Sequence, residues 1–573
     1  MGSILEDLST RIRVWRAAPP RGRALALAWQ PEPRAHGSAR AGARLLEGTW
    51  HLAGATVVHD GAPWTIAAPS APFAVQLHGM GWLDDLMALG GREAQRRARD
   101  WTLAWVARHG AGGGPGWAPA PTGRRLLRMI CHAPALLAGA ERTAPYFDAL
   151  YRQARVLADD WPRAAPGLPR MEALTGLLYA GLTLEGMADL RPRAVMGLAV
   201  ALAEDVRPDG GIASRNPEAL LEVATLLNWV LSALEGARHE RPAALMAARR
   251  RIVPTLRALR HADGGLARFH GGAAGREGRL DRALAASGVP ARNDSGLAMG
   301  FLPAHHGRTS LVVDADVPPA GAVSGSAHAS TLAFELTSGA TPVIVSCGPG
   351  GAFGPDWHRA GRATASHSTL SLDGHSSARV GAPIPVGTGR VAPLVQGPRE
   401  VMWQRSAARR SSTLILSHDG WRTSHGLIHL RRLVLSTDGR TLQGEDALRA
   451  VTAADKERLE DVRLAAAEDA VGFAIRFHLH PDATAEIGLG GQAASIVLPS
   501  GETWLLRPGR GAPVSIEPSV HLDPARLHPR PSSQVVFTGR LLSYAATVDW
   551  TLTRVEEAGA PAPHPSQPPE RAP

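Results

Sequence analysis

The residues best suited to chemistry in this sequence are histidines, which gather in short motifs of its second half. His367 lies in the segment 365–370, His418 begins a His-Asp-Gly-Trp motif, and His478 and His480 alternate in a strand-like run. Side chains at positions i and i+2 of a strand lie on one face, and imidazole titrates near neutral pH or binds metals. A single strand histidine is usually a packing residue. Several on one face indicate a metal or proton-transfer site, although their spacing is not that of a tight zinc motif.

The first half offers a second group of candidates, beside two similar Asp-Gly-Gly turns that begin at Asp209 and Asp263. Arg215 and Asn216 follow the first turn, and an Arg-Phe-His run ending at His270 follows the second. An Asn-Pro pair is a typical helix start. The same geometry supplies hydrogen-bond donors and positive potential for a carboxylate. His270 is either a solvated loop histidine or an acid/base group.

The elements that must position these residues change in character near residue 300. From about 80 to 260, apolar residues recur with a helical period in segments separated by Gly or Pro. From about 309 to 553 the period is two, and turn dipeptides separate short runs. We therefore predict an α+β multidomain protein, in which stacked helical hairpins precede an antiparallel β-sandwich. The predicted domains are an N-terminal extension (1–70), a helical domain (71–300), a sandwich domain (301–555) and a disordered Pro-rich tail (556–573).

Composition excludes several classes of protein. The chain has 573 residues, so it can bury large cores, and its two cysteines, Cys131 and Cys347, lie too far apart in sequence for a disulfide framework. Its formal net charge is +10, but Lys456 is the only lysine among 62 basic residues. Such arginine richness beside abundant Ala, Gly and Pro partly reflects base composition, so the charge alone does not identify an acidic partner.

Targeting signals are not visible in the sequence. Acidic and basic residues interrupt the first 23 positions, where a secretory signal needs an apolar core. The best apolar run, 219–234, contains Glu222 and is shorter than a bilayer requires. We expect a cytoplasmic protein with no membrane span and no nucleic-acid partner, and the sequence leaves its oligomeric state open.

Several of these motifs together resemble the heparinase II/III family over roughly residues 70 to 550, most specifically in the second half. The motifs that carry the resemblance are Trp82-Leu83-Asp84-Asp85-Leu86, Asp209-Gly210-Gly211, Arg215-Asn216-Pro217-Glu218, Ala365-Ser366-His367-Ser368-Thr369-Leu370, His418-Asp419-Gly420-Trp421, the run 429–432, Gly444-Glu445-Asp446 and Arg476-Phe477-His478-Leu479-His480-Pro481. The resemblance implies an incomplete α/α toroid followed by an antiparallel β-sandwich. It would place an enzyme of this kind in the periplasm or cell envelope.

The resemblance also implies β-elimination on an acidic polysaccharide or oligosaccharide that contains uronic acid. A base takes the C5 proton, the uronate carboxylate is neutralised, and an acid protonates the departing O4. By this resemblance Asn216 matches the toroid amide and His367 the sandwich histidine, with His270 as a substitute acid/base. The substrate-binding arginines would be Arg215, Arg268 and Arg362.

A structural metal, usually zinc, is a further implication of the resemblance. His418 matches a histidine that binds it, and we expect His367 and Asp373 as the other ligands. The sequence departs from the family pattern at Pro217, where lyases commonly carry His, and around His270, where a catalytic Tyr is expected.

Two alternatives to a lyase therefore stay open. The first is a glycan-binding or cell-envelope-associated protein of the same fold without turnover. The second is a toroid glycoside hydrolase, in which two of Asp209, Glu218 and Glu222 would face each other across a cleft as acid and base.

Overall fold

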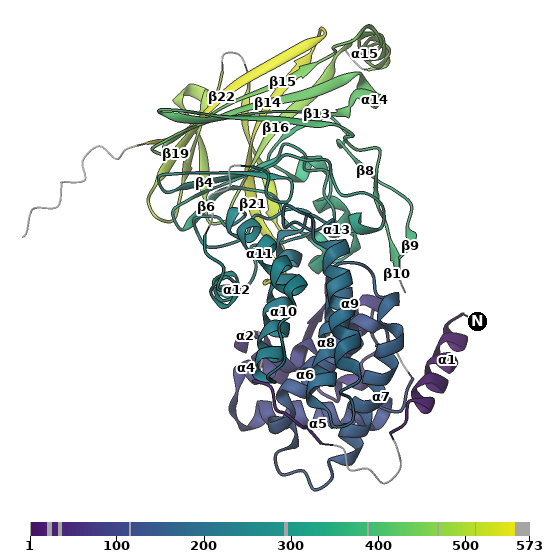
Figure 1. Ribbon diagram of the computed structural model, residues 1–573. Helices are drawn as coiled ribbons and strands as arrows, with labels where there is room; N and C mark the ends of the chain where they lie inside the picture. The colour runs from purple at the N-terminus through teal and green to yellow at the C-terminus, as the bar shows by residue number, and fades with distance from the viewer. Residues whose placement is uncertain are drawn as a thin grey trace, which may run out of the picture.

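The chain folds into a helical half and a β-sheet half, stacked end to end (Figure 1). A computed structural model describes residues 2–19, 26–32, 37–113, 116–291, 296–386, 389–466, 469–509 and 512–555. The predicted tail 556–573 lies outside the described residues. The order of an α-helical domain before an antiparallel sandwich is the predicted one.

Helices form two concentric layers of an incomplete toroid. The helices of the first half are α1 (Gly2–Arg16), α2 (Ala39–Leu46), α3 (Ala71–His78), α4 (Gly81–Leu89), α5 (Gly91–His109), α6 (Pro119–Leu137), α7 (Ala144–Asp160), α8 (Leu168–Thr183), α9 (Leu190–Asp205), α10 (Pro217–Gly236), α11 (Ala243–Ala258) and α12 (Arg279–Ser287). The even-numbered helices α4, α6, α8 and α10 contact one another in sequence and form the inner layer. The odd-numbered α5, α7, α9 and α11 do the same on the outside.

Local sequence explains where these helices begin. Proline occupies the first or second position of α6, α7, α8 and α10, where its missing N–H is not needed. Ser70 caps α3 through the Phe73 N–H, at 3.3 Å. A short hairpin of β1 (Thr49–Leu52) and β2 (Ala55–Val58) precedes α3. Of the described helices, α10 is long and apolar enough to cross a membrane, but 67% of its apolar window is buried inside the protein.

Two large antiparallel sheets make up the second half. The first has the strand order β12-β13-β14-β15-β22-β19-β18-β17, and the second β20-β21-β16-β6-β5-β4-β3, with β7 paired to β16. Their strands are β3 (Phe301–His306), β4 (Thr309–Asp314), β5 (Phe334–Ser338), β6 (Thr341–Val345), β7 (Leu370–Leu372), β12 (Val401–Ala408), β13 (Ser411–Trp421), β14 (Leu427–Ser436), β15 (Thr441–Arg449), β16 (Val471–Leu479), β17 (Thr484–Gly488), β18 (Ala493–Val497), β19 (Thr503–Pro508), β20 (Val514–His521), β21 (Arg530–Leu541) and β22 (Ala545–Val555).

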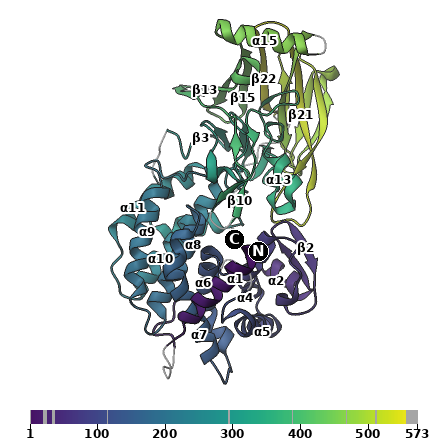
Figure 2. The same ribbon diagram turned by 90° about the vertical axis from the view of Figure 1, so that its right-hand side faces the viewer.

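Shorter elements complete this half. The pairs β8 (Arg379–Val380) with β11 (Leu394–Val395), and β9 (Ile384–Val386) with β10 (Gly389–Val391), form two small antiparallel sheets. Figure 2 shows β10 on the toroid side of the sandwich. The helices here are α13 (Pro355–Gly361), α14 (Arg422–His425) and α15 (Ala453–Ala465). Aromatic rings fill the space between the large sheets: Trp550 stacks on Phe334 with ring centroids 5.9 Å apart.

The structure corrects the sequence-based elements at several positions. The apolar period runs on from 171 to 190, but α8 ends at Thr183, and Leu184 pairs as an isolated bridge with Leu27. The alternating pattern predicts a single strand over 541–553, whereas the structure has the end of β21, a turn and most of β22 there. Such errors of one turn or a few residues leave the order of elements unchanged.

Candidate functional site

The two Asp-Gly-Gly turns have the same local structure and point into the junction between toroid and sandwich. In the first turn Asp209 Oδ1 accepts the Gly211 N–H, and in the second Asp263 Oδ1 accepts the Gly265 N–H, each at 2.9 Å. The middle glycine of each turn has a positive φ. Each turn leads to a non-glycine residue in the left-handed region, Arg215 and His270, both with φ of 50°. Strain of this kind is typical of functional sites or over-determined junctions.

Arg215 is completely engaged by the protein. Its Nε donates to Met299 O at 3.0 Å, Nη1 to the carbonyls of Asp316 and Val317, and Nη2 to Gly300 O and to Asp314 Oδ1 at 2.5 Å. These five bonds use all five N–H groups of a guanidinium. Arg215 is 2% exposed. Its predicted role in binding substrate would require it to give up one of these partners.

Arg268 and Arg362 are similarly placed. Arg268 lies 3.4 Å from the buried Glu335 carboxylate, which also accepts the Arg268 backbone N–H at 3.0 Å and lies 3.3 Å from His261 Nε2. Arg362 donates to three backbone carbonyls, those of Ala327, Ala392 and Ser324. The arginines predicted to bind substrate therefore bind carbonyl and carboxylate groups of the protein itself in this structure.

Asp314 and Glu335 are the anionic partners of the junction. Burial raises the pKa of Asp314, but Arg215 and His270 outweigh it and hold the pKa well below its usual range. Burial likewise raises the pKa of Glu335, and Arg268 and His261 bring it down to about 2. Both carboxylates are therefore ionised at neutral pH, and each is paired across the two domains.

Three buried histidines form a row behind these ion pairs. The ring centroids of His270 and His328 are 6.0 Å apart, and those of His328 and His367 are 4.9 Å apart. The backbone N–H of His328 donates to His270 Nδ1 at 3.1 Å. The ring proton of His270 is therefore on Nε2, which faces Asp314 at 3.4 Å. The Gly271 N–H donates to His328 Nε2 at 3.0 Å. The predicted pair His270 and His367 thus lies in one row, with His328 between them.

Apart from His270 Nε2, which faces the Asp314 carboxylate, two buried ring nitrogens in this row have no partner. His328 Nδ1 and His367 Nε2 are buried without a hydrogen bond, whereas His367 Nδ1 lies 3.0 Å from Ser346 Oγ. Burial, with His478 as a neighbour, lowers the pKa of His367 to about 3. Burial and His367 lower the pKa of His328 well below its usual value. Both rings are therefore neutral at physiological pH, and unsatisfied buried nitrogens of this kind need an explanation.

Asn216 lies beside this row and has a structural role. Its Oδ1 accepts the Ala219 N–H at 2.9 Å and caps α10. A Cβ added to Gly272 would be 2.7 Å from that oxygen, so the loop after His270 lies against Asn216. Both turns open at the same end of the toroid, which brings Asn216, His270 and His367 into one region.

The predicted zinc ligands do not form a metal site. His418 Nδ1 accepts the Gly420 N–H, and its Nε2 lies 3.3 Å from His429 Nδ1. His429 Nε2 in turn donates to Asp446 at 2.7 Å. Both nitrogens of each ring thus have partners without a metal. Among the described residues, no group of three or more His, Cys, Asp or Glu side chains is arranged to hold a metal ion.

Asp373, the third predicted ligand, is exposed at the end of β7, whereas His367 and His418 are buried. The residues present therefore do not fit the family's zinc. Asp446 instead binds Arg431 through both oxygens, at 2.7 and 3.0 Å, and accepts the Trp550 Nε1–H at 2.9 Å. This network lies between the two sheets and stabilises the sandwich.

The inner toroid helices, together with the start of α12 and the loop before it, present opposite charges in pairs. Four arginines face four carboxylates: Arg124–Glu172 at 3.4 Å, Arg128–Asp84 at 2.9 Å, Arg276–Asp85 at 3.6 Å, and Arg279–Glu222. A surface for a polyanion normally carries uncompensated positive charge. Of the hydrolase candidates, Glu218 and Glu222 lie on the same helix and do not face each other across a cleft, and Glu218 accepts the Ala273 N–H. The third candidate, Asp209, accepts the Gly211 N–H within its own turn.

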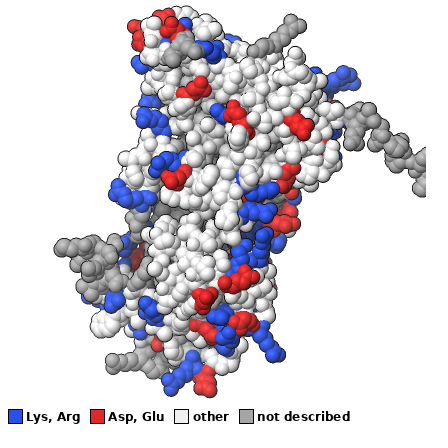
Figure 3. Space-filling view, turned by 180° about the vertical axis from the view of Figure 1, so that it is seen from behind, with Lys and Arg blue, Asp and Glu red and all other residues white. Residues whose placement is uncertain are grey.

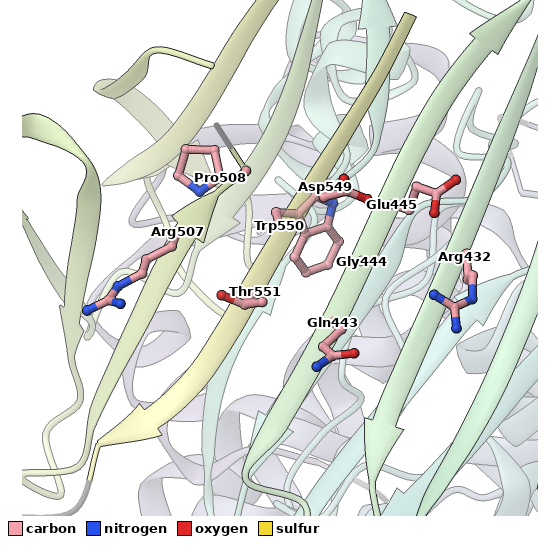
Figure 4. A pocket seen from close by; sticks show the side chains of 10 residues that line it. Arg432, Gln443, Gly444, Glu445, Arg507, Pro508, Asp549, Trp550 and Thr551 are labelled. Carbon is pink, nitrogen blue, oxygen red and sulfur yellow. The ribbon is translucent and has the colours of Figure 1, made fainter. Parts of the chain in front are cut away.

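Surface features lie away from this row. On the face shown in Figure 3, basic and acidic side chains are intermixed, mostly along the edges and the lower part, and broad areas between them carry no charge. A pocket of about 210 Å³ opens on the sheet of β14, β15, β19 and β22, where Arg432, Gln443, Glu445, Arg507 and Asp549 surround Gly444 (Figure 4). Its polar side chains come from neighbouring strands and not from the junction.

Sequence reasoning missed His328, Asp314 and Glu335. His328 sits between small residues in a loop that matches no motif, and the two acids follow or interrupt apolar strand runs. An acidic residue inside such a run is a signal of a buried ion pair, because a buried charge needs a partner.

Comparison with known proteins agrees with this architecture. The sequence profile described as "Heparinase II/III-like, C-terminal" matches residues 289–551. The chain is 33% identical over 545 residues to FtsZ-localized protein C of Caulobacter vibrioides (strain NA1000 / CB15N), covering 92% of this chain and 89% of that protein.

Solved structures extend the likeness to the whole fold. A mutant of the heparan sulfate lyase HepC from Pedobacter heparinus superposes with a TM-score of 0.60 at 13% identity, covering 98% of this chain and 89% of that one. Heparinase III superposes with a TM-score of 0.65 at 11% identity, covering 87% of this chain and 80% of that one. The matched profile and the shared toroid-and-sandwich architecture agree, and the chain belongs to the heparinase II/III family.

Proposed function

We propose that this protein works at the cell-division site, localised with FtsZ, and that its heparinase fold serves there as a rigid two-domain scaffold. The observation that carries the proposal is the 33% identity to FtsZ-localized protein C, which extends over 92% of this chain and so covers both domains and their junction. The likeness to the lyase structures, at 11–13% identity, concerns the fold alone.

The geometry of the junction supports a scaffold. The three arginines predicted to bind substrate have protein acceptors. The tyrosines lie away from the histidine row: Tyr146 OH donates to Met129 O, Tyr179 OH to Trp229 O, Tyr151 is on α7, and Tyr544 joins β21 to β22. A His367 pKa of about 3 also makes that imidazole a weak base at neutral pH.

Cosedimentation tests the scaffold proposal. Full-length protein is mixed with purified FtsZ, with GTP to form polymers or with GDP as the control, and then centrifuged. We expect the protein to pellet with the polymers and to stay in the supernatant with GDP. A fluorescent fusion should form a band with FtsZ at midcell. A diffuse fusion and no cosedimentation would overturn the proposal.

A second candidate is β-elimination on a uronate-containing glycan, and one observation favours it. His328 Nδ1 and His367 Nε2 are buried polar atoms without a partner, and an approaching substrate would supply one. In this mechanism Asn216 Nδ2 would hold the uronate carboxylate. One of the two histidines would take the C5 proton, and the other would protonate O4. His270 would position His328, because its own Nδ1 accepts the His328 N–H.

Ultraviolet absorbance of an unsaturated uronate product tests this candidate against a panel of acidic polysaccharides. Turnover that falls about 10²–10⁴-fold in both His328→Ala and His367→Ala, but not in the exposed control His375→Ala, would establish the lyase. No absorbance change with any glycan would leave the scaffold as the function.

A further inference from the structure

A cysteine and a histidine lie together on the sandwich, outside the histidine row. Cys347 follows β6, His478 lies on β16, and Ser519 lies on β20. The Cys347 sulfur is 3.6 Å from His478 Nδ1 and 3.8 Å from Ser519 Oγ, and that hydroxyl is 2.8 Å from His478 Nδ1. Neither proposed function above makes use of these three side chains.

The orientation of His478 makes it a base for the thiol. Its Nε2 lies 2.9 Å from the backbone carbonyl of Ala365. A carbonyl only accepts, so the ring proton is on Nε2 and the lone pair is on Nδ1, facing Cys347 and Ser519. A nucleophile beside a base that a third group orients is the arrangement of nucleophilic sites.

The thiol also lines a cavity. A pocket of about 300 Å³ is bounded by Cys347, Ala365, His478 and Gln534, together with residues 518–520 of β20. None of these lining side chains carries a fixed charge. Burial raises the pKa of the Cys347 thiol, but His478 and Ser519 outweigh it and bring the pKa below its usual value. Cysteines activated in this way are the reactive ones in proteins.

From this geometry we infer that Cys347 is a reactive thiol that takes a small, uncharged disulfide in the pocket, with His478 as its base. His478 Nδ1 accepts the thiol proton, and the sulfur of Cys347 attacks one sulfur of the disulfide. The disulfide S–S bond breaks as the new one forms. The departing thiolate takes the proton back from His478 and leaves as a thiol. Cys347 is oxidised to a mixed disulfide while half of the small disulfide is reduced.

The site is coupled to the histidine row through the backbone. The Cys347 N–H donates to Ser366 O at 2.9 Å, and the His478 N–H donates to Ser368 Oγ at 3.0 Å. His367 lies between these two serines.

The test is the reaction of the full-length protein with 2-hydroxyethyl disulfide at pH 7, followed by intact mass and peptide mapping. We expect one adduct, on Cys347, formed at least about tenfold faster than on Cys131, which is 1% exposed on α6. The Cys131→Ser variant should react like the wild type, and Cys347→Ser should form no fast adduct.

The variant His478→Gln separates the base from the structure, because its amide can still donate to Ala365 O. We expect its reaction to be about tenfold slower at pH 7 and to need a higher pH. The wild-type rate should reach half its maximum below the ordinary thiol pKa of about 8.5, a measurement that does not depend on the variant folding. Equal rates in wild type and His478→Gln, a wild-type midpoint at or above that value, or preferential labelling of Cys131 would each overturn the inference.

Discussion

The guanidinium of Arg215 lies 2.5 Å from the carboxylate of Asp314, although the two residues are 99 positions apart and belong to different domains. Arg268 and Glu335 form a second ion pair of the same kind. Arg268 follows the second Asp-Gly-Gly turn of the toroid, and Glu335 lies on β5, next to the β4 strand that carries Asp314. The two charged turns of the helical domain thus end on two charged strands of the sandwich. Arg215 and Arg268, which the sequence predicts to bind an anionic substrate, therefore lie at the junction between the two domains and bind its carboxylates.

Removing Arg215 should destabilise the protein strongly. Arg215→Met leaves Asp314 buried without its cation, which typically costs about 3–5 kcal/mol. Chemical denaturation should show this loss, and Asp314→Asn in the same chain should recover part of it. The matched control is Arg96→Met, which removes an exposed pair with Glu93 and should leave the midpoint unchanged. Equal midpoints for Arg215→Met and Arg96→Met would refute the assignment.

Glu335 should make the protein sensitive to acid. Its pKa is about 2 in the folded state, below the ordinary 4.5, so its contribution is present above pH 4.5 and is lost as the pH falls towards 2. Glu335→Gln should therefore lower the free energy of unfolding at pH 7 by about 3 kcal/mol. The difference between wild type and variant should shrink to near zero at pH 2. A difference that stays constant over this range would contradict the prediction.

Gly272 should tolerate no side chain. A Cβ there would be 2.7 Å from Asn216 Oδ1 and 3.3 Å from the Glu218 nitrogen, so Gly272→Ala displaces the cap of α10. The expected cost is about 1–2 kcal/mol, measured by denaturant titration. Gly81→Ala is the control, since a Cβ at Gly81 meets nothing within 4 Å. The idea fails if both variants are equally stable.

Chelation should leave the protein unchanged. Because the nitrogens of His418 and His429 have protein partners, we expect no stoichiometric zinc by elemental analysis and the same Tm with and without EDTA. Asp446→Ala, in contrast, leaves the buried Arg431 without its counter-charge and should lower stability by about 3–5 kcal/mol. Bound zinc together with a fall in Tm on chelation would restore the predicted metal site.

Much of the fold was predictable because it rests on local signals. The 3.6-residue period and the proline positions located α4 to α11, and alternation located most strands. The sequence did not predict β15, because Glu445 and Asp446 interrupt its alternation of apolar and polar residues. Asp446 is buried only through Arg431, His429 and Trp550, which no local window contains.

The candidate site shows the same limit. Motifs brought Asn216, His270 and His367 to attention, and the structure places them in one region. What a motif does not contain is the partner of each side chain. An arginine beside a turn has the same sequence whether its counter-charge is a sugar carboxylate or Asp314, because that partner is fixed by tertiary packing.

The paired charges of the junction also bear on how such a gene can be divided. A fragment that ended before β3 would present Arg215 and Arg268 to water, and the remaining fragment would hold Asp314 and Glu335 inside a sheet with no cation beside them. Neither piece is a self-sufficient module. Recombination at this boundary would be tolerated only if the incoming partner brought matching charges, so the toroid and the sandwich are expected to be inherited as one unit.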